Sequence, residues 1–386
     1  MSVPMTGSPA FAHQLLEDVR RYESFGIHRY GSPGAEATLD WIAEELGNAG
    51  LKVTEQRFAI SRQYDLKSAT LMVGGKRLEV MPQWWIPEAL AAFSLSATIA
   101  AGGFERVTLP FDSGAYLNDS HRAKLAEAFA RRPRAVLLSI DHPSGEIFTY
   151  NVDQVSKPWP MPVILVAPKD RGVLDDAERS ARKLEVKLVG RHIHDVAGRN
   201  IVARLDRGKG KWLVISTPVT SWFTSTCERG PGVAGFLALA RLAAREFKDV
   251  DVVFVATSGH EIGHGGMEQF LRHAAPPPPI TLAWAHLGSS LACNDPVLKA
   301  INSSESMSSQ VDRHFAGIEG VRLTGERAAI GELREVHTAG YSNFFGAAGS
   351  HKFFHTPFDN VSGFAQDRLV PLVVAFAATL AASAAK

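Results

Sequence analysis

Apolar and polar residues follow different periods along the chain, and the period predicts which segments form helices and which form strands. Apolar residues recur every three or four positions around residues 11–19 and again over 35–49, which predicts two amphipathic helices near the N-terminus. Between 51 and 58 they alternate with polar residues, which predicts a half-buried strand. The chain therefore opens with two helices and a strand.

Apolar periodicity in the second half of the chain also predicts strands that alternate with helices. Strands are expected over 200–205, 212–216, 251–256 and 280–287, and helices over 232–247, 267–274 and 369–385. The strand at 251–256, DVVFVA, is apolar and β-branched without alternation, which is typical of a strand covered on both faces. These elements predict an α/β domain.

Residues 59–197 differ from the rest of the chain. Short strands are expected there at 69–73, 135–139, 163–166 and 184–189, and turn-rich linkers separate them. A β-rich domain over 59–197 is therefore predicted as an insertion into an α/β domain made of 1–58 and 198–386.

Composition narrows the class of protein. At 386 residues the chain is long enough for one large or two modest domains, and its 45% apolar and 21% charged residues are ordinary for a soluble protein. A formal net charge of +1 gives no electrostatic reason to expect nucleic acid or a membrane as a partner. Cys227 and Cys293 are the only cysteines, so no disulfide framework is expected. The N-terminus lacks the pattern of a secretory signal, and the apolar stretches at 90–104 and 369–385 are shorter than the ~18 residues of a membrane span, so we expect a cytoplasmic protein.

Candidate chemistry begins directly after the buried strand at 251–256. His260, Glu261 and His264 spell H-E-x-x-H, which on a helix places two imidazoles on one face beside a carboxylate. Glycines at 259, 263, 265 and 266 interrupt the motif, and each costs about 1 kcal/mol inside a helix. Two interpretations follow. Either this is a zincin with His260 and His264 as ligands and Glu261 as base, or a strand-to-helix turn presents the side chains to a metal from a loop, beyond the carboxyl end of a strand.

Two segments resemble the zinc aminopeptidase family (metallopeptidase family 28). Residues 29–58, RYGSPGAEATLDWIAEELGNAGLKVTEQRF, resemble its opening turn, helix and strand, and residues 341–360, YSNFFGAAGSHKFFHTPFDN, resemble its closing motif. Residues 161–177, MPVILVAPKDRGVLDDA, are similar to the protease-associated domain inserted in many of these enzymes. The resemblance implies a mixed, mainly parallel sheet sandwiched between helices over 1–58 and 198–386, with a protease-associated-like, β-rich domain inserted at 59–197.

The resemblance also implies a metal site, from which this chain departs. Where the family has His-x-Asp, this chain has Pro218 and Thr220, and 284–288 contains no carboxylate where a later Asp is expected. The bridging Asp corresponds to Glu228, the Glu-Glu pair to His260-Glu261, and the final zinc-binding His to His355. One metal position is therefore expected to be lost, and the other to keep Glu261 and His355.

The remaining residues complete the predicted site. Glu228 is the expected third metal ligand, unless it only places charge at a helix N-terminus, and His264 can add a fourth. This set predicts one divalent ion per chain, with zinc as the first choice and Mn, Fe or Co also suited. Residues expected to contact the substrate are Arg229, His286 and Tyr341, although Arg229 can instead pair with Glu228 and His286 can instead be a core histidine.

These residues predict a metal-dependent hydrolase acting on an amide or other C–N bond of a small, non-standard or short peptide-like substrate. His260 replaces the usual glutamate base and works beside Glu261 on a metal-activated water. Glutaminyl cyclases, which share the fold in outline, also work with one zinc. An amidase or deaminase fits this set better than a general peptidase. The alternatives are a metal-free relative that serves as a binding or scaffolding protein, and the zincin; a homo-oligomer remains open.

Overall fold

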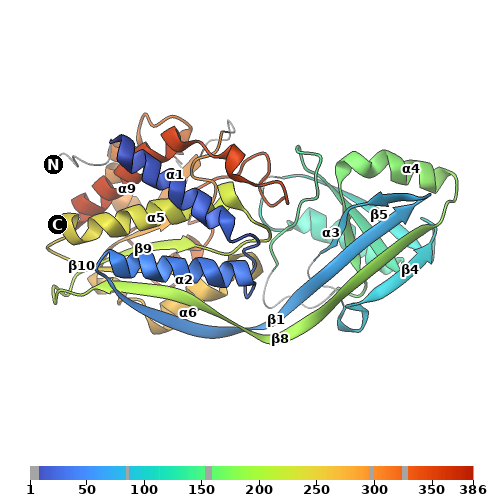
Figure 1. The fold of residues 1–386 in the computed structure, drawn as a ribbon, viewed down its shortest axis with the longest axis horizontal. Helices are drawn as coiled ribbons and strands as arrows, with labels where there is room; N and C mark the ends of the chain where they lie inside the picture. Colours follow the sequence, from blue (N-terminus) through green and yellow to red (C-terminus); the bar gives the residue numbers. More distant parts are fainter. Residues whose placement is uncertain are drawn as a thin grey trace. The chain divides into compact units, whose positions relative to one another are not determined.

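The chain forms two compact units. The computed structural model describes residues 8–83, 87–112, 114–152, 159–294, 299–323 and 329–385. The first unit comprises Met1–Phe58, Ala197–Phe354 and Phe358–Lys386, and the second comprises Ala59–Val196 with His355–Pro357. Two 22-residue strands, β1 (Lys52–Val73) and β8 (Leu184–Leu205), contribute residues to both units and are drawn as the two longest arrows in Figure 1. The sequence pattern places the boundaries at 58/59 and 197/198, and the protease-associated character of the second unit stays a prediction.

A mixed sheet forms the centre of the first unit. Its strands run in the order β13-β12-β14-β11-β9-β10-β8-β1, and the four middle strands β14, β11, β9 and β10 are parallel. β8 pairs antiparallel with β10, and β12 pairs antiparallel with β14. This mixed sheet and its helices confirm the predicted fold class. The strand bounds are β9 Trp212–Pro218, β10 Asp251–Thr257, β11 Thr281–Leu287, β12 Lys299–Ser303, β13 Val321–Leu323 and β14 Phe344–Ala348.

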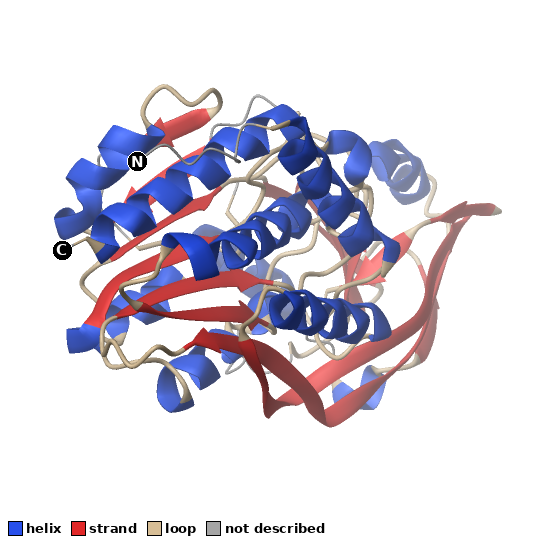
Figure 2. Ribbon diagram, turned by 60° about the vertical axis from the view of Figure 1, so that its left-hand side comes forward, coloured by secondary structure: helices blue, strands red, loops and turns tan. Residues whose placement is uncertain are grey.

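Helices cover both faces of this sheet, as Figure 2 shows. Alternate strand residues point to opposite faces: Leu213 and Ile215 pack into one core cluster with five helices, and Val214 packs into another with two. The first cluster contains residues of α1 (Pro9–Ser24), α2 (Pro33–Asn48), α5 (Thr226–Glu246), α7 (Ser308–Phe315) and α9 (Gln366–Ala384). The second contains residues of α6 (Gly265–His273) and α8 (Leu333–Thr338).

The apolar C-terminal helix α9 belongs to the core of the first unit. Among the described residues, α9 is the one helix whose length and apolar composition are sufficient to cross a membrane. Its Leu369, Val373, Phe376 and Leu380 are buried against the sheet in the first core cluster. Packing in this core accounts for the apolar composition of α9.

The second unit contains a four-stranded sheet in the order β3-β7-β6-β5 and a further set of strands in which β4 pairs with β8, and β1 with β2. Apolar residues of both sets, among them Leu71, Leu137 and Val186, form one core cluster. The elements are β2 Lys76–Leu78, β3 Val80–Pro82, β4 Phe93–Ala97, β5 Phe104–Pro110, α3 Asp119–Ala130, β6 Ala135–Asp141, β7 Val163–Val166 and α4 Arg171–Arg179.

Candidate functional site

The candidate residues of the first unit follow the carboxyl ends of its parallel strands. β9, β10 and β11 run parallel, so their carboxyl ends lie at the same edge of the sheet. Thr220 follows β9, His260 and Glu261 follow β10, and Ser290 follows β11. Ligand sites of open α/β sheets lie at this edge.

The segment that carries H-E-x-x-H is a turn rather than a helix. His260–Ile262 form a single 3-10 turn, and α6 begins only at Gly265. Gly259, Gly263 and His264 have φ angles of 79°, 95° and 58°, a left-handed conformation that ends any continuous right-handed helix. The zincin interpretation needs the motif on one regular helix and is therefore wrong for this segment.

Two carboxylates, those of Glu332 and Glu335, fix the orientation of the His260 and His264 rings. His260 Nδ1 lies 3.1 Å from Glu332 Oε1, and His264 Nδ1 lies 3.0 Å from Glu335 Oε1, at the start of α8. Glu332 is fully buried and also accepts a hydrogen bond from Thr257 Oγ1 at 2.9 Å. Because an ionised carboxylate only accepts, Nδ1 of His260 carries the proton, and the acceptor lone pair is on Nε2.

Sequence patterns did not identify Glu332 and Glu335. The only local signal is their three-residue spacing, which places both carboxylates on one side of a helix start. The two imidazole rings that they hold have centroids 4.5 Å apart. The structure thus joins a predicted pair of histidines to an unpredicted pair of acids.

Glu261 is buried, and protein donors occupy both of its oxygens. Tyr30 N donates to Oε1 and Thr220 Oγ1 donates to Oε2, each at 2.7 Å. Thr220 Oγ1 in turn accepts from Gly259 N at 2.7 Å. Burial raises the pKa of Glu261, and these hydrogen bonds and Arg229 partly offset that effect. Thr220, at the position implied for a metal-binding acid, here serves as a donor to another carboxylate.

Glu228 and Arg229 lie in the first turn of α5 and are both inaccessible to solvent. Ser221 Oγ donates to Glu228 Oε2 at 2.6 Å, and Arg229 Nη2 forms an ion pair with Glu228 Oε1 at 2.9 Å. Arg229 Nε donates to the carbonyl oxygen of Thr220 at 3.2 Å. Among the described residues, Arg229 Nη1 has no hydrogen-bond partner, although the side chain is only 1% exposed.

A carboxylate from the closing motif caps α5. Asp359 accepts hydrogen bonds from Cys227 N at 2.7 Å and Glu228 N at 3.0 Å, and its charge suits a helix N-terminus. Ser225, with φ of 51°, provides no side-chain cap of its own. Pro231 cannot donate to the Cys227 carbonyl, which instead accepts a weak hydrogen bond from Cys293 Sγ at 3.7 Å.

His351 forms an ion pair with Asp359, the residue that caps α5. Its Nε2 lies 3.3 Å from Asp359 Oδ1, and its Nδ1 lies 2.9 Å from Ser290 Oγ. Burial alone lowers the pKa of His351, but the Asp359 carboxylate outweighs burial and raises it to about 10. His351 is therefore a buried imidazolium, which no pattern in the sequence identified.

His286 and Tyr341 have internal partners. His286 Nδ1 lies 2.9 Å from Ser216 Oγ, and burial lowers the pKa of His286 to about 4, so the ring is neutral. Tyr341 donates to the Pro276 carbonyl at 2.7 Å, and its ring packs edge-on against Trp284 at 4.8 Å. Tyr341 therefore packs in the core of the first unit, and its role as a substrate contact stays a prediction. The substrate role of His286 stays a prediction.

His355 is grouped with the second unit. Its Nδ1 lies 2.8 Å from the Thr149 carbonyl oxygen, and Thr149 N donates to the His355 carbonyl at 3.2 Å. Its pairing with Glu261 on one ion, the basis of the predicted metal site, stays a prediction.

The residues of the first unit do not fit a metal ion. Both oxygens of Glu261 accept hydrogen bonds, and both oxygens of Glu228 contact Ser221 or Arg229. A guanidinium already supplies positive charge between these groups, and a dication beside it would be repelled. Across the described parts of the chain, no three His, Cys, Asp or Glu side chains are arranged to hold a metal ion.

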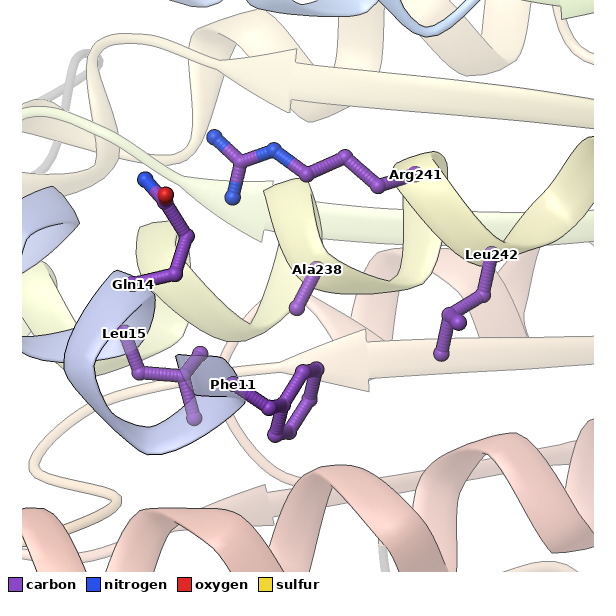
Figure 3. A pocket seen from close by; sticks show the side chains of 6 residues that line it. All are labelled: Phe11, Gln14, Leu15, Ala238, Arg241 and Leu242. Atoms are coloured by element: carbon purple, nitrogen blue, oxygen red, sulfur yellow. The ribbon is translucent and has the colours of Figure 1, made fainter. Parts of the chain in front are cut away.

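A separate cavity in the first unit is lined mainly by apolar side chains. It measures about 190 Å³ and lies between α1 and α5, where Phe11, Leu15, Ala238 and Leu242 line it (Figure 3). Its polar lining is Gln14 and Arg241, and Arg241 pairs with Asp18 and Glu45. This cavity offers apolar surface and no group suited to general acid or base chemistry.

Comparison with known proteins identifies the fold class. No family model matches the chain, and no curated protein does. The chain has the zinc-aminopeptidase fold, as the resemblance implies, and solved structures share it over nearly their whole length.

The particular structures are distant in sequence. BSAP, a zinc aminopeptidase from Bacillus subtilis, superposes with a TM-score of 0.74 at 16% identity, over 95% of this chain and 94% of that one. A peptidase M28 precursor from Shewanella amazonensis gives 0.70 at 15% identity, over 97% and 96%. A glutaminyl cyclase from Fimbriiglobus ruber gives 0.54 at 11% identity, over 97% and 96%. These identities establish the fold, so the chemistry is argued from the residues of the site itself.

Proposed function

We propose that the first unit hydrolyses an amide or another C–N bond of a small or short peptide-like substrate, with His260 as the general base. The observation that supports this is the buried chain of contacts from Thr257 to Glu332 to His260 Nδ1. A carboxylate behind an imidazole fixes its tautomer and orientation and stabilises the imidazolium that forms during proton transfer.

The protonation state of His260 suits this role. Burial, and after it the nearby Arg229, lowers the pKa of His260 well below its usual value, so the ring is neutral at neutral pH. Nε2 takes a proton from water as the water oxygen bonds to the substrate carbonyl carbon. The C–N bond then breaks, and the same proton passes from Nε2 to the leaving nitrogen.

These steps are derived without a metal ion, because the described residues of the first unit alone do not offer a set of ligands that fits one. The shared fold does not select the substrate either, since it occurs in structures named as aminopeptidases and as glutaminyl cyclases. A base together with a cationic donor suits attack of water on a carbonyl compound, and the C–N bond of the substrate is carried over from the sequence-based prediction. Cytoplasmic location, freedom from nucleic acid and membranes, and oligomeric state stay predictions.

A substrate screen with matched histidine variants tests the proposal. Aminoacyl amides, N-acyl amides and aromatic amides are assayed with wild type, H260Q and H314Q. We expect H260Q to lower kcat by about 10²–10⁴-fold. H314Q is the control because His314, on α7, only pairs with Thr379 Oγ1 at 3.0 Å, so its turnover should stay at the wild-type level. Full activity of folded H260Q would contradict the proposal.

A second candidate is a binding protein without turnover. One observation favours it: Glu261, Glu228 and Asp359 all accept hydrogen bonds from within the protein, as a rigid scaffold requires. This candidate predicts that no amide in the screen is hydrolysed while some bind, with equal affinity for wild type and H260Q.

A further inference from the structure

We propose that the guanidinium of Arg229 is the permanent cation of this sheet edge, in the role that a metal ion would otherwise have, and that its Nη1 binds an oxygen atom of the substrate. The first half stands on its own geometry. The second half rests on the proposed hydrolytic function.

The burial of two acids at this edge requires a compensating cation. Glu228 and Glu261 are both fully buried, and an unpaired buried carboxylate is strongly destabilising. Arg229, itself 1% exposed, lies 2.9 Å from Glu228 Oε1. An arginine keeps its charge at every accessible pH, so the compensation cannot be titrated away.

Thr220 connects Arg229 to the second acid. Its carbonyl oxygen accepts from Arg229 Nε at 3.2 Å, while its hydroxyl donates to Glu261 Oε2 at 2.7 Å. Glu228, Arg229, Thr220 and Glu261 therefore form one continuous network of polar contacts. This network supplies both carboxylates with partners from within the chain: neutral donors for Glu261, and a serine hydroxyl and one guanidinium for Glu228.

One donor of this network has no acceptor. Arg229 Nε and Nη2 are engaged, but Nη1 is buried and has no hydrogen-bond partner among the residues that the structure describes. A buried unsatisfied charged donor is costly unless an acceptor arrives from outside. A carbonyl or carboxylate oxygen of a ligand fits, because a guanidinium binds such oxygens with charge-assisted hydrogen bonds.

A guanidinium in place of a metal ion can perform one of the metal's two chemical functions but not the other. A metal ion both polarises a carbonyl and lowers the pKa of its bound water. A guanidinium can stabilise the oxyanion through its N–H donors, but it holds no water as a ligand. Activation of water must then come from a separate base, and His260 on Glu332 is placed for it.

The first experiment measures metal and stability on the full chain. Wild-type protein, prepared with added zinc and then dialysed, is analysed for metal content and titrated with Zn²⁺. We expect far less than one equivalent of zinc and no change of Tm with a chelator. One equivalent of zinc that the E261Q substitution removes would overturn the proposal.

The second experiment restores the cation chemically. R229G should lose thermal stability, and methylguanidinium should recover part of the Tm while methylammonium should not. The matched control is R241G, which also removes a guanidinium between two acids, Asp18 and Glu45. Arg241 is 28% exposed and its partner Glu45 is 27% exposed, although Asp18 is buried, so water and salt compensate more of the charge there than at Arg229, and a smaller recovery is expected. Equal recovery of both variants would contradict a special role for Arg229.

R229K serves if R229G does not fold. Lysine keeps the charge but cannot bridge Thr220, Glu228 and a ligand at once. We expect a folded, zinc-free protein with a raised KM or lowered kcat, and unchanged kinetics would overturn ligand binding by Nη1. Zinc content is read independently of turnover. An active H260Q variant would therefore remove the proposed function without touching the first half of this proposal.

Discussion

Two buried arginines of the first unit have opposite surroundings. Arg199, on β8, has all three guanidinium nitrogens paired: Nε with Glu36 at 3.0 Å, Nη1 with Glu55, and Nη2 with Asp40. Arg229, on α5, pairs Nε and Nη2 but leaves Nη1 without a partner among the described residues.

The acids that pair with the two arginines also differ in their exposure to solvent. The three partners of Arg199 are 35–69% exposed, whereas Glu228 is fully buried. The guanidinium of Arg199, which is fully paired with solvent-exposed acids, connects α2, β1 and β8. The guanidinium of Arg229, with one nitrogen unpaired and a buried partner, carries an electrostatic cost that an oxygen atom of a ligand would relieve. The difference separates an arginine kept for architecture from one kept for binding.

The largest expected effect separates the two arginines directly. R229M leaves Glu228 buried without its cation, so we expect a loss of about 3–5 kcal/mol in the free energy of unfolding. It also removes a donor to the substrate oxygen, which should lower kcat/KM by about 10²–10³-fold. R199M should reduce stability by less and leave kcat/KM within about twofold. Urea unfolding and steady-state kinetics measure both, and a similar loss of turnover in the two variants would break the comparison.

A smaller loss of activity is expected at the acid behind the base. E332Q keeps the shape of the side chain but cannot hold His260 in the donor tautomer, so kcat should fall by at least about 10-fold. E335Q acts on His264 through a carboxylate that is 26% exposed and should cost less. If E335Q were the more damaging variant, His264 rather than His260 would be the base.

The pH dependence of stability should differ between the two regions. His28, hydrogen-bonded to Thr38 of α2, has its pKa lowered to about 4 by burial, so the unfolded chain takes up the proton first as pH falls from 6.5. Its contribution is present above pH 6.5 and is lost as pH falls through 4. His351, beside the start of α5, has a pKa raised to about 10, so its contribution is present below pH 6.5 and is lost as pH rises through 10.

Each histidine contributes a few kcal/mol across its window. Denaturant unfolding from pH 4 to 10 should show H28Q flattening the acid limb and H351Q flattening the alkaline limb. Identical limbs in H351Q and wild type would exclude a charged His351 at the start of α5.

The smallest effect is expected for Asp40, the most exposed of the three acids that pair with Arg199. Asp40 is 69% exposed, and exposed ion pairs contribute about 0–1 kcal/mol. D40N should therefore change the free energy of unfolding by less than about 0.5 kcal/mol, without effect on kinetics. A loss as large as that of R229M would show that exposure does not distinguish the two arginines.

The sequence predicted most elements that have an apolar face. The strand expected at 163–166 coincides with β7, Val163–Val166, and the strand at 280–287 differs from β11 by one residue. The full length of β8 was not predicted, because most of its residues between 189 and 197 are exposed or half-buried. Where neither face of a strand enters a core, the alternation that identifies strands is absent.

The site was predicted only where its residues are neighbours in sequence. His260, Glu261, Glu228 and Arg229 were found because they follow a buried strand or start a helix. Glu332 lies 72 residues from His260, and Asp359 lies 131 from Glu228. Such pairs leave no local pattern. Thr220 was not predicted as a site residue, because it stands where the resemblance implies a metal-binding Asp, whereas here its hydroxyl donates to Glu261.

The cap on α5 has a consequence for how the protein is made. The helix that carries Glu228 and Arg229 takes its N-terminal partner from Asp359, 131 residues after Glu228. At about 5–20 residues per second, a ribosome therefore needs several seconds to add the acid that caps this helix. Until Asp359 has been synthesised, the amide groups of Cys227 and Glu228 lack the carboxylate to which they finally donate.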